Sequence, residues 1–185
     1  MKSRLIIGGA RSGKSRFAQE LAIKSGKPVL FVATAVAGDE EMQQRIEEHK
    51  RTRPASWSTL EVTRHIGNQI AGEIGTAQVV IIDCITLLVS NILVRYADRG
   101  REQIDASLME EEVTSEIGEL TECINRLDAS FIIVTNEVGT GLVPTNKMGR
   151  LYRDVLGKAN QLLAQQADEV HLMVSGLAVK IKPAS

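Results

Sequence analysis

Residues 8–15 carry the clearest chemical signal in this sequence, because they fit the pattern of a phosphate-binding loop. The segment reads Gly-Gly-Ala-Arg-Ser-Gly-Lys-Ser and matches G-x-x-x-x-G-K-[ST]. Glycines let the backbone wrap around phosphate oxygens, and a helix N-terminus adds its positive dipole end. The residues expected to bind nucleotide here are Gly8, Gly9, Ala10, Arg11, Ser12, Gly13, Lys14 and Ser15. The alternative is a glycine-rich turn that holds no phosphate.

Two side chains of this phosphate loop (residues 8–15) have distinct predicted roles. Lys14 would reach the β- and γ-phosphates, and the Ser15 hydroxyl would ligate Mg²⁺. A second metal ligand is expected at Asp83, which directly follows the apolar run 79–82. Proteins with a phosphate loop of this kind usually place an acidic residue at the end of a neighbouring strand, where it helps to position Mg²⁺. The alternative for Asp83 is a strand-end residue that caps the next turn. Together these residues indicate nucleoside-triphosphate chemistry and leave the acceptor open.

His49 is a third candidate, because it continues the inward face of a helix predicted over residues 39–53. It lies three residues after Ile46, and Arg53 follows four residues later. At about 3.6 residues per turn these side chains share one face. One interpretation is a half-buried structural histidine at a basic helix end. The other is a second phosphate site, where a neutral imidazole attacks phosphorus while Lys50 and Arg53 neutralise the transferred group.

These candidates must be positioned by short apolar runs that alternate with longer amphipathic segments. Apolar runs rich in β-branched residues predict buried parallel strands, and helical periodicity predicts the segments between them. Strands are expected at 5–7, 29–34, 79–82, 131–135 and 170–174, with an antiparallel edge strand at 178–181. Helices are expected at 15–25, 39–53, 104–127 and 146–167. This alternation predicts an α/β fold, with a mostly parallel sheet flanked by helices.

Composition narrows the class of protein further. The 185 residues are 43% hydrophobic and 24% charged, so residues 1–185 are expected to form a single catalytic domain. A net charge of −1 and 3% aromatic residues argue against a nucleic-acid partner. Two cysteines without CxxC spacing fit a reduced, cytoplasmic protein. The nearly uncharged stretch 77–94 contains Asp83, so we expect a buried strand and its continuation there, and no contact with a membrane.

Several longer motifs occur in one order along essentially the whole chain. After the phosphate loop come Phe31-Val-Ala-Thr-Ala, Arg45-Ile-x-x-His-Lys-x-x-Arg-Pro, Trp57-x-Thr-x-Glu, Asp83-Cys-Ile-Thr, Thr135-Asn-Glu-Val-Gly and Tyr152-Arg-Asp. Together they resemble the bifunctional adenosylcobinamide kinase / adenosylcobinamide-phosphate guanylyltransferase family of cobalamin biosynthesis. The resemblance implies a RecA-like fold and a homotrimer.

The resemblance also implies an activity and its residues. Members phosphorylate adenosylcobinamide, their corrinoid substrate, with ATP or GTP, and then transfer GMP from GTP through a GMP-histidine intermediate, releasing pyrophosphate. His49 matches the nucleophilic histidine, and His49 and Lys14 are the expected catalytic residues. Outside the phosphate loop, the matching nucleotide-binding residues are Ala33, Thr34, Ala35, Lys50, Arg51, Thr52, Arg53, Glu61 and Asp83.

Some roles stay open at this point. Glu61 could bind guanine through its N1–H and amino group, or could bind ribose. Glu137, at the end of a predicted strand, could be a base for the corrinoid hydroxyl or an acid that stabilises a turn, and Asn136 shares this ambiguity. Asp83 stands where some members carry Glu, so its reach differs by one methylene. The alternative functions are a P-loop small-molecule kinase without nucleotidyl transfer, a non-catalytic nucleotide-binding regulator, and an enzyme that retains guanylyl transfer alone.

Overall fold

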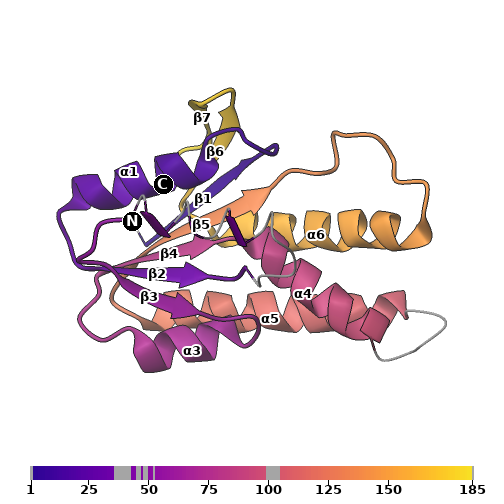
Figure 1. Cartoon of the computed structure of the whole chain (residues 1–185), viewed down its shortest axis with the longest axis horizontal. Coiled ribbons are helices and arrows are strands. Elements are labelled where there is room, and N and C mark those ends of the chain that lie inside the picture. Colours follow the sequence, from indigo (N-terminus) through magenta and orange to yellow (C-terminus); the bar gives the residue numbers. More distant parts are fainter. Residues whose placement is uncertain are drawn as a thin grey trace.

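The fold is organised around one sheet of seven strands within the described part of the chain. The computed structural model describes residues 2–35, 43–44, 47, 50–51, 53–98 and 105–184. The strands are ordered β3-β2-β4-β5-β1-β6-β7 across the sheet (Figure 1). Their bounds are β1 Ser3–Gly8, β2 Val29–Ala33, β3 Ser58–Glu61, β4 Val79–Asp83, β5 Ser130–Asn136, β6 Glu169–Val174 and β7 Leu177–Lys182. β1 to β6 pair in parallel, and β7 is antiparallel to β6.

The six predicted strands are confirmed to within about two residues at each end. β2 is buried at every position and β4 at all but its last residue, because helices or loops cover both faces of this part of the sheet. β3 was missed by the sequence analysis. Its polar residues are mostly exposed at the sheet edge, so no apolar run marks this strand.

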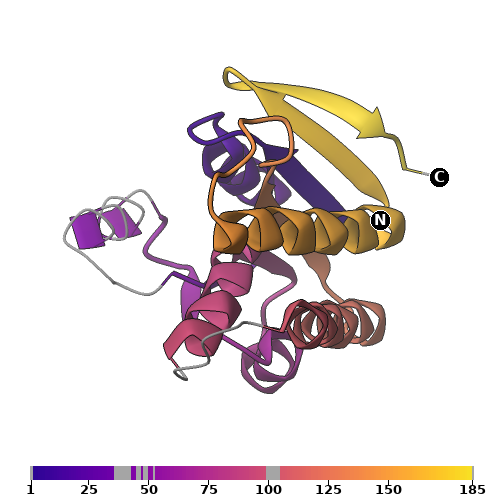
Figure 2. The same cartoon turned by 90° about the vertical axis from the view of Figure 1, so that its right-hand side faces the viewer.

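Five helices lie wholly within the described ranges, and they divide between the two faces of the sheet. They are α1 Lys14–Ser25, α3 Ile66–Glu73, α4 Ile85–Asp98, α5 Ala106–Arg126 and α6 Lys147–Gln166. α1 packs on one face over β1, β4 and β5, whereas α3 to α6 pack together on the other (Figures 1 and 2). No helix in these ranges is long and apolar enough to cross a membrane.

The predicted helices are confirmed at α1, α5 and α6. Asp105 caps the first turn of α5 by accepting from two backbone N–H groups, and Asn146 caps α6 by accepting from Gly149 N. The predicted helix 39–53 can be compared at few positions: residues 43, 44, 47, 50 and 51 are helical, and the other residues up to 52 lie outside the described part. α3 and α4 were not predicted. α4 follows the buried strand β4 so closely that the two form one apolar stretch in the sequence.

Candidate active site

The phosphate loop lies between β1 and α1, as its sequence predicts. Gly13 precedes the helix with φ 94°, a left-handed conformation that glycine adopts without strain. A Cβ on Gly8 would lie 2.5 Å from the carbonyl oxygen of Met173 on β6, so a side chain does not fit there. The loop is thus shaped by backbone conformation and close packing, and both require glycine.

Lys14 is folded back into the loop. It is 7% exposed, and its Nζ donates to the carbonyl oxygen of Gly9 at 2.6 Å. Burial lowers the pKa of Lys14 below its ordinary value, while the nearby Asp83 carboxylate acts in the opposite direction. A phosphate in the loop would provide this ammonium group with a stronger acceptor than the carbonyl.

Neighbouring strands brace the loop from behind. Gly176 N, in the turn between β6 and β7, donates to Ser12 O at 3.0 Å. Glu137 N, just after β5, donates to Gly8 O at 3.0 Å. The loop is therefore tied to two segments that come more than a hundred residues later in the chain.

Asp83 ends β4 beside the end of β2, where Ala33 is its partner in the parallel register. The fully buried Thr34 locks the two strand ends together. Its hydroxyl donates to Cys84 O at 2.7 Å and accepts from Cys84 N at 2.8 Å. Burial, assisted by the Asp83 charge, raises the pKa of Cys84 to about 12, so this thiol is not a nucleophile at neutral pH.

The oxygen donors of Ser15 and Asp83 suit a magnesium ion. Mg²⁺ usually binds one or two protein oxygens, with water and substrate phosphates completing its shell. In the described ranges there is no group of three or more His, Cys, Asp or Glu side chains that could hold a metal. The donor set therefore fits an ion that arrives with a nucleotide.

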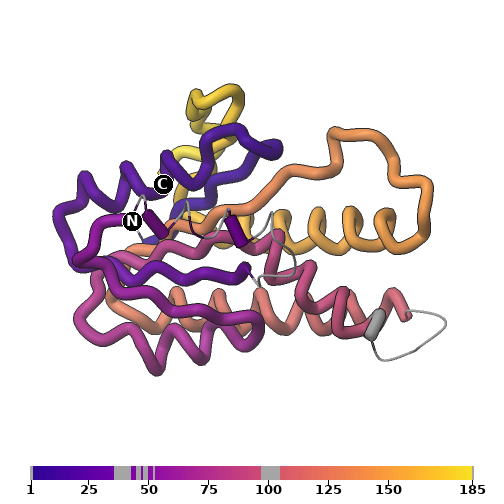
Figure 3. The backbone as a smooth tube through the Cα atoms, viewed as in Figure 1, coloured from indigo at the N-terminus to yellow at the C-terminus, as the bar shows by residue number. Residues whose placement is uncertain are grey.

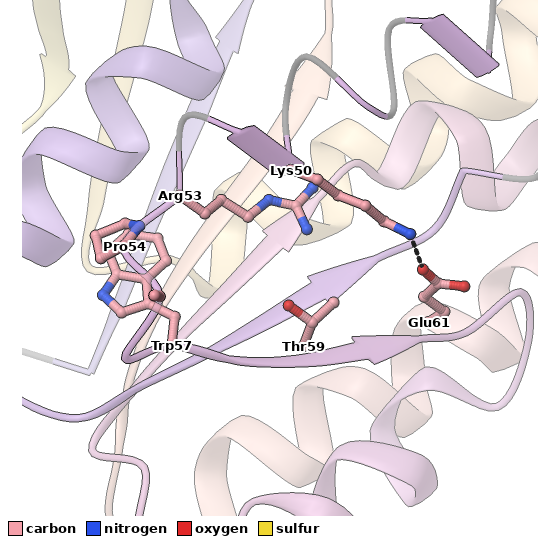
Figure 4. A pocket seen from close by; sticks show the side chains of 7 residues that line it. Lys50, Arg53, Pro54, Trp57, Thr59 and Glu61 are labelled. Atoms are coloured by element: carbon pink, nitrogen blue, oxygen red, sulfur yellow. Dashed lines mark ion pairs between the residues drawn. The ribbon is translucent and has the colours of Figure 1, made fainter.

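A basic pocket of about 360 Å³ lies over the ends of β2 and β3, on the face that α1 covers elsewhere (Figure 4). Its lining residues are Lys50, Arg53, Pro54, Ala55, Trp57, Thr59 and Glu61. Lys50 Nζ pairs with Glu61 Oε1 at 2.7 Å. Both partners line the pocket and are at least half exposed, so a ligand can compete for either of them.

Arg53 is the less satisfied cation of this basic pocket. Its guanidinium lies over the ring of Phe31, 3.6 Å from the centroid. Its Nε and Nη1 are buried and have no hydrogen-bond partner among the described residues. Burial lowers the pKa of Arg53, against the effect of the Asp83 and Glu61 charges. A planar cation with unused donors suits the oxygens of a phosphate.

The structure brings several predicted residues to one edge of the sheet. The charges of Lys14 and Arg53 both interact with Asp83, so the phosphate loop and the basic pocket share this carboxylate. Ala10, Arg11 and Arg51 are exposed, Ser15 and Ala35 are half-buried, and Thr34 is fully buried. His49 and Thr52 lie outside the described residues.

Phe31 and Thr59 were not predicted from the sequence as site residues. Phe31 supports the Arg53 guanidinium from the buried strand β2, and Thr59 lines the basic pocket from β3. A phenylalanine in a buried strand carries no sign that a cation lies over its ring. The only signal for Thr59 was its place in the Trp57-x-Thr-x-Glu motif, one of the motifs that carry the family resemblance.

These features define a P-loop nucleotide-binding enzyme with a RecA-like fold. A solved protein from Pyrococcus horikoshii OT3 is similar with a TM-score of 0.58 and 9% identity, over 100% of this chain and 87% of that one. RadB recombinase is similar with a TM-score of 0.52 and 14% identity, over 92% of this chain and 73% of that one. At these identities the likeness concerns the fold alone.

The chain belongs to the cobinamide kinase / cobinamide phosphate guanyltransferase family, whose model matches residues 4–181. The bifunctional adenosylcobalamin biosynthesis proteins CobU of Escherichia coli and Salmonella typhimurium are 43% and 44% identical to it over 179 residues, 96% of this chain and 98% of theirs. The bifunctional adenosylcobalamin biosynthesis protein CobP of Pseudomonas aeruginosa is 38% identical over 182 residues, 96% of each chain. The family resemblance seen in the sequence is therefore confirmed. The members of this family are bifunctional enzymes, with a kinase and a guanylyltransferase activity.

Proposed function

We propose that this enzyme phosphorylates adenosylcobinamide with ATP or GTP and then transfers GMP from GTP to adenosylcobinamide-phosphate, giving adenosylcobinamide-GDP and pyrophosphate. The observation that carries the proposal is a second cationic site beside the phosphate loop. Lys14 serves the loop, and Arg53, which shares the Asp83 carboxylate with it, presents buried donors that have no partner among the described residues. A plain kinase has no need of the second site.

The kinase step needs no covalent intermediate, and positioning and charge neutralisation contribute to its catalysis. The backbone N–H groups of the phosphate loop and Lys14 hold the β- and γ-phosphates. Mg²⁺, held by Ser15 and Asp83, would neutralise charge on the phosphates when bound.

In the guanylyl step, neutral His49 attacks the α-phosphorus of GTP and pyrophosphate leaves. Arg53 and Lys50 stabilise the charge on the α-phosphate. The phosphate of the corrinoid then attacks the GMP-histidine and frees the imidazole. Glu61, once released from Lys50, can accept from the N1–H and amino group of guanine, which adenine cannot offer.

The test is the intact mass of the protein after incubation with GTP and Mg²⁺ at neutral pH, without corrinoid. We expect a GMP adduct that maps to His49, and none in His49→Ala, which should retain kinase activity. His65→Asn is the matched control, because His65 is exposed and asparagine tolerates its positive φ. If the wild-type protein binds GTP but forms no GMP adduct, the guanylyl-transfer half of the proposal is wrong and the protein is a plain kinase.

We also propose that the chain works as a homotrimer in the cytoplasm. The β6–β7 hairpin supports an oligomer, because Val174, Leu177, Val179 and Ile181 are all more than half exposed. Light scattering of the purified protein should give three times the mass of one chain. A monomer at assay concentration would contradict the assembly and leave the chemistry untouched.

A further inference from the structure

The kinase step and the guanylyl step differ in whether the acceptor group must lose a proton. In the kinase step the acceptor is a hydroxyl group, and its proton must leave as the oxygen bonds to the γ-phosphorus. In the guanylyl step the acceptor is a phosphate, which is already ionised at neutral pH. A general base is therefore useful in the first transfer and has no proton to remove in the second.

Three described carboxylates lie at the carboxyl edge of the sheet near the phosphate loop or the basic pocket. Glu61 is on the outermost strand β3 and pairs with Lys50. Asp83 ends β4 and interacts with Lys14 and Arg53. Glu137 directly follows β5, which lies between β1 and β4. Because Glu137 N donates to Gly8 O at 3.0 Å, this residue adjoins the phosphate loop itself.

The Glu137 carboxylate is held in place without a cation. Its Oε1 accepts from Gly139 N at 2.5 Å, and no ion pair is found for it in the described ranges. A Cβ on Gly139 would lie 2.8 Å from this oxygen, so glycine permits the close approach. The residue is half-buried, and no hydrogen bond to its Oε2 is found in the described ranges.

The strand end that carries Glu137 is fixed by side chains from two helices. Asn136 N donates to Thr86 Oγ1 on α4 at 2.7 Å. Asn160 on α6 donates from Nδ2 to Asn136 O at 3.0 Å, and its Oδ1 accepts from Thr135 Oγ1 at 2.7 Å. Beyond this point the chain crosses to α6 past the carboxyl ends of the strands (Figure 3). A residue at such a rigid junction can hold the geometry that proton transfer requires.

We propose that Glu137 is the general base of the kinase step, an inference that rests on the proposed function. The Glu137 carboxylate takes the proton of the corrinoid hydroxyl while the hydroxyl oxygen bonds to the γ-phosphorus. The bond from the γ-phosphorus to the bridging oxygen breaks, and the nucleoside diphosphate leaves. The protonated Glu137 then returns its proton to water.

The test measures both transfers separately in Glu137→Gln, with adenosylcobinamide and ATP in one assay and adenosylcobinamide-phosphate and GTP in the other. We expect kcat of the kinase reaction to fall about 10²–10⁴-fold, with KM for adenosylcobinamide changed by less than about threefold. Formation of the GMP adduct and its transfer should stay within about threefold of wild type. Glu73→Gln, an exposed charge loss at the end of α3, is the matched control.

Gly139→Ala gives a second test, because the added Cβ displaces the Glu137 carboxylate while leaving it in the chain. It should also slow the kinase reaction selectively. Equal losses in both reactions, in variants with wild-type melting temperatures, would assign Glu137 a structural role and overturn the inference. An unchanged kinase rate in Glu137→Gln would overturn it as well. A wild-type enzyme that forms no GMP adduct would instead contradict the guanylyl half of the proposed function.

Discussion

Two charged clusters near opposite edges of the sheet are built on different principles. On the β6–β7 side, Glu169 is 6% exposed and accepts from Arg4 Nε at 2.8 Å and Lys180 Nζ at 2.5 Å. These hydrogen bonds lower the pKa of Glu169 to about 2. On the β2–β3 side, Arg53 has two buried nitrogens without a partner among the described residues.

The difference shows which cluster is structural and which is ready for a ligand. The Glu169 cluster satisfies its buried charge from within the chain, so it contributes to stability and offers nothing to a substrate. In the Arg53 cluster a guanidinium is partly buried, and two of its nitrogens have no hydrogen-bond partner among the described residues. This burial lowers the stability of the fold, and it favours the binding of an anion that would accept from these nitrogens. Substitutions at the two sites should therefore have opposite effects on activity and stability.

The largest expected effect comes from Arg53→Ala. We expect kcat/KM for GMP transfer to fall about 10²–10³-fold, because a donor to the developing charge is lost. The free energy of unfolding should change by less than about 1 kcal/mol, since the lost contact with Phe31 is offset by removing two buried nitrogens that have no partner among the described residues. Steady-state kinetics and denaturant titration measure the two quantities, with exposed Arg64→Ala as the control. A large loss of stability with normal kinetics would reverse the assignment of the two clusters.

Glu169→Gln should show the opposite pattern. The variant leaves Arg4 and Lys180 without their carboxylate, and we expect a loss of about 2 kcal/mol in the free energy of unfolding. Kinetic constants per folded molecule should match wild type. Glu20→Gln, which removes an exposed pair with Arg16, should cost less than about 0.5 kcal/mol. Unchanged stability in Glu169→Gln would show that the hydrogen bonds of this cluster are worth no more than those to water.

The pH dependence of stability should also separate the clusters. The pKa of Glu169 lies at about 2 in the folded chain, below its ordinary value of 4.5. Its contribution is therefore fully present above pH 4.5 and is lost as the pH falls toward 2. The stability gap between wild type and Glu169→Gln should narrow over this range in denaturant titrations at a series of pH values. A gap that stays constant down to the lowest pH would contradict the lowered pKa.

Glu61→Gln gives the smallest expected effect. An amide cannot accept from both guanine donors, so the preference for GTP over ATP in adduct formation should fall about tenfold. The rate with ATP should change little. Rates of adduct formation measured by intact mass with each nucleotide decide this. If the variant keeps the wild-type preference for GTP, Glu61 does not recognise guanine, and its role is to bind the ribose or to pair with Lys50.

The sequence predicted the centre of the fold better than its margins. β2 and β4 are apolar at almost every position because both faces are covered, and such runs stand out in any sequence. β3 is short, polar and exposed, and it becomes a strand by pairing with β2. α4 is apolar enough to merge with β4 in the sequence, so its start could not be separated from the strand.

The candidate site divides in the same way. Local spacing predicted the phosphate loop, because its glycines, Lys14 and Ser15 act within eight residues of one another. The state of Arg53 could not be predicted, since it depends on the ring of Phe31 and on the buried environment over β2. The bracing of the loop by Glu137 and Gly176 likewise depends on strand order, which spacing along the chain does not contain.

The position of β1 has a consequence for how the chain is made. β1 is synthesised before the other six strands of this sheet, yet its two neighbours in the sheet are β5 and β6, which begin at Ser130 and Glu169. The phosphate loop thus has neither flanking strand until most of the chain has been synthesised. Contacts between such distant segments slow folding and prolong the exposure of apolar strands to aggregation. The residues of β1 and the phosphate loop are translated before the rest of the sheet but are among the last to reach their final neighbours. A nascent chain that ends before β5 therefore lacks the strands that flank the phosphate loop.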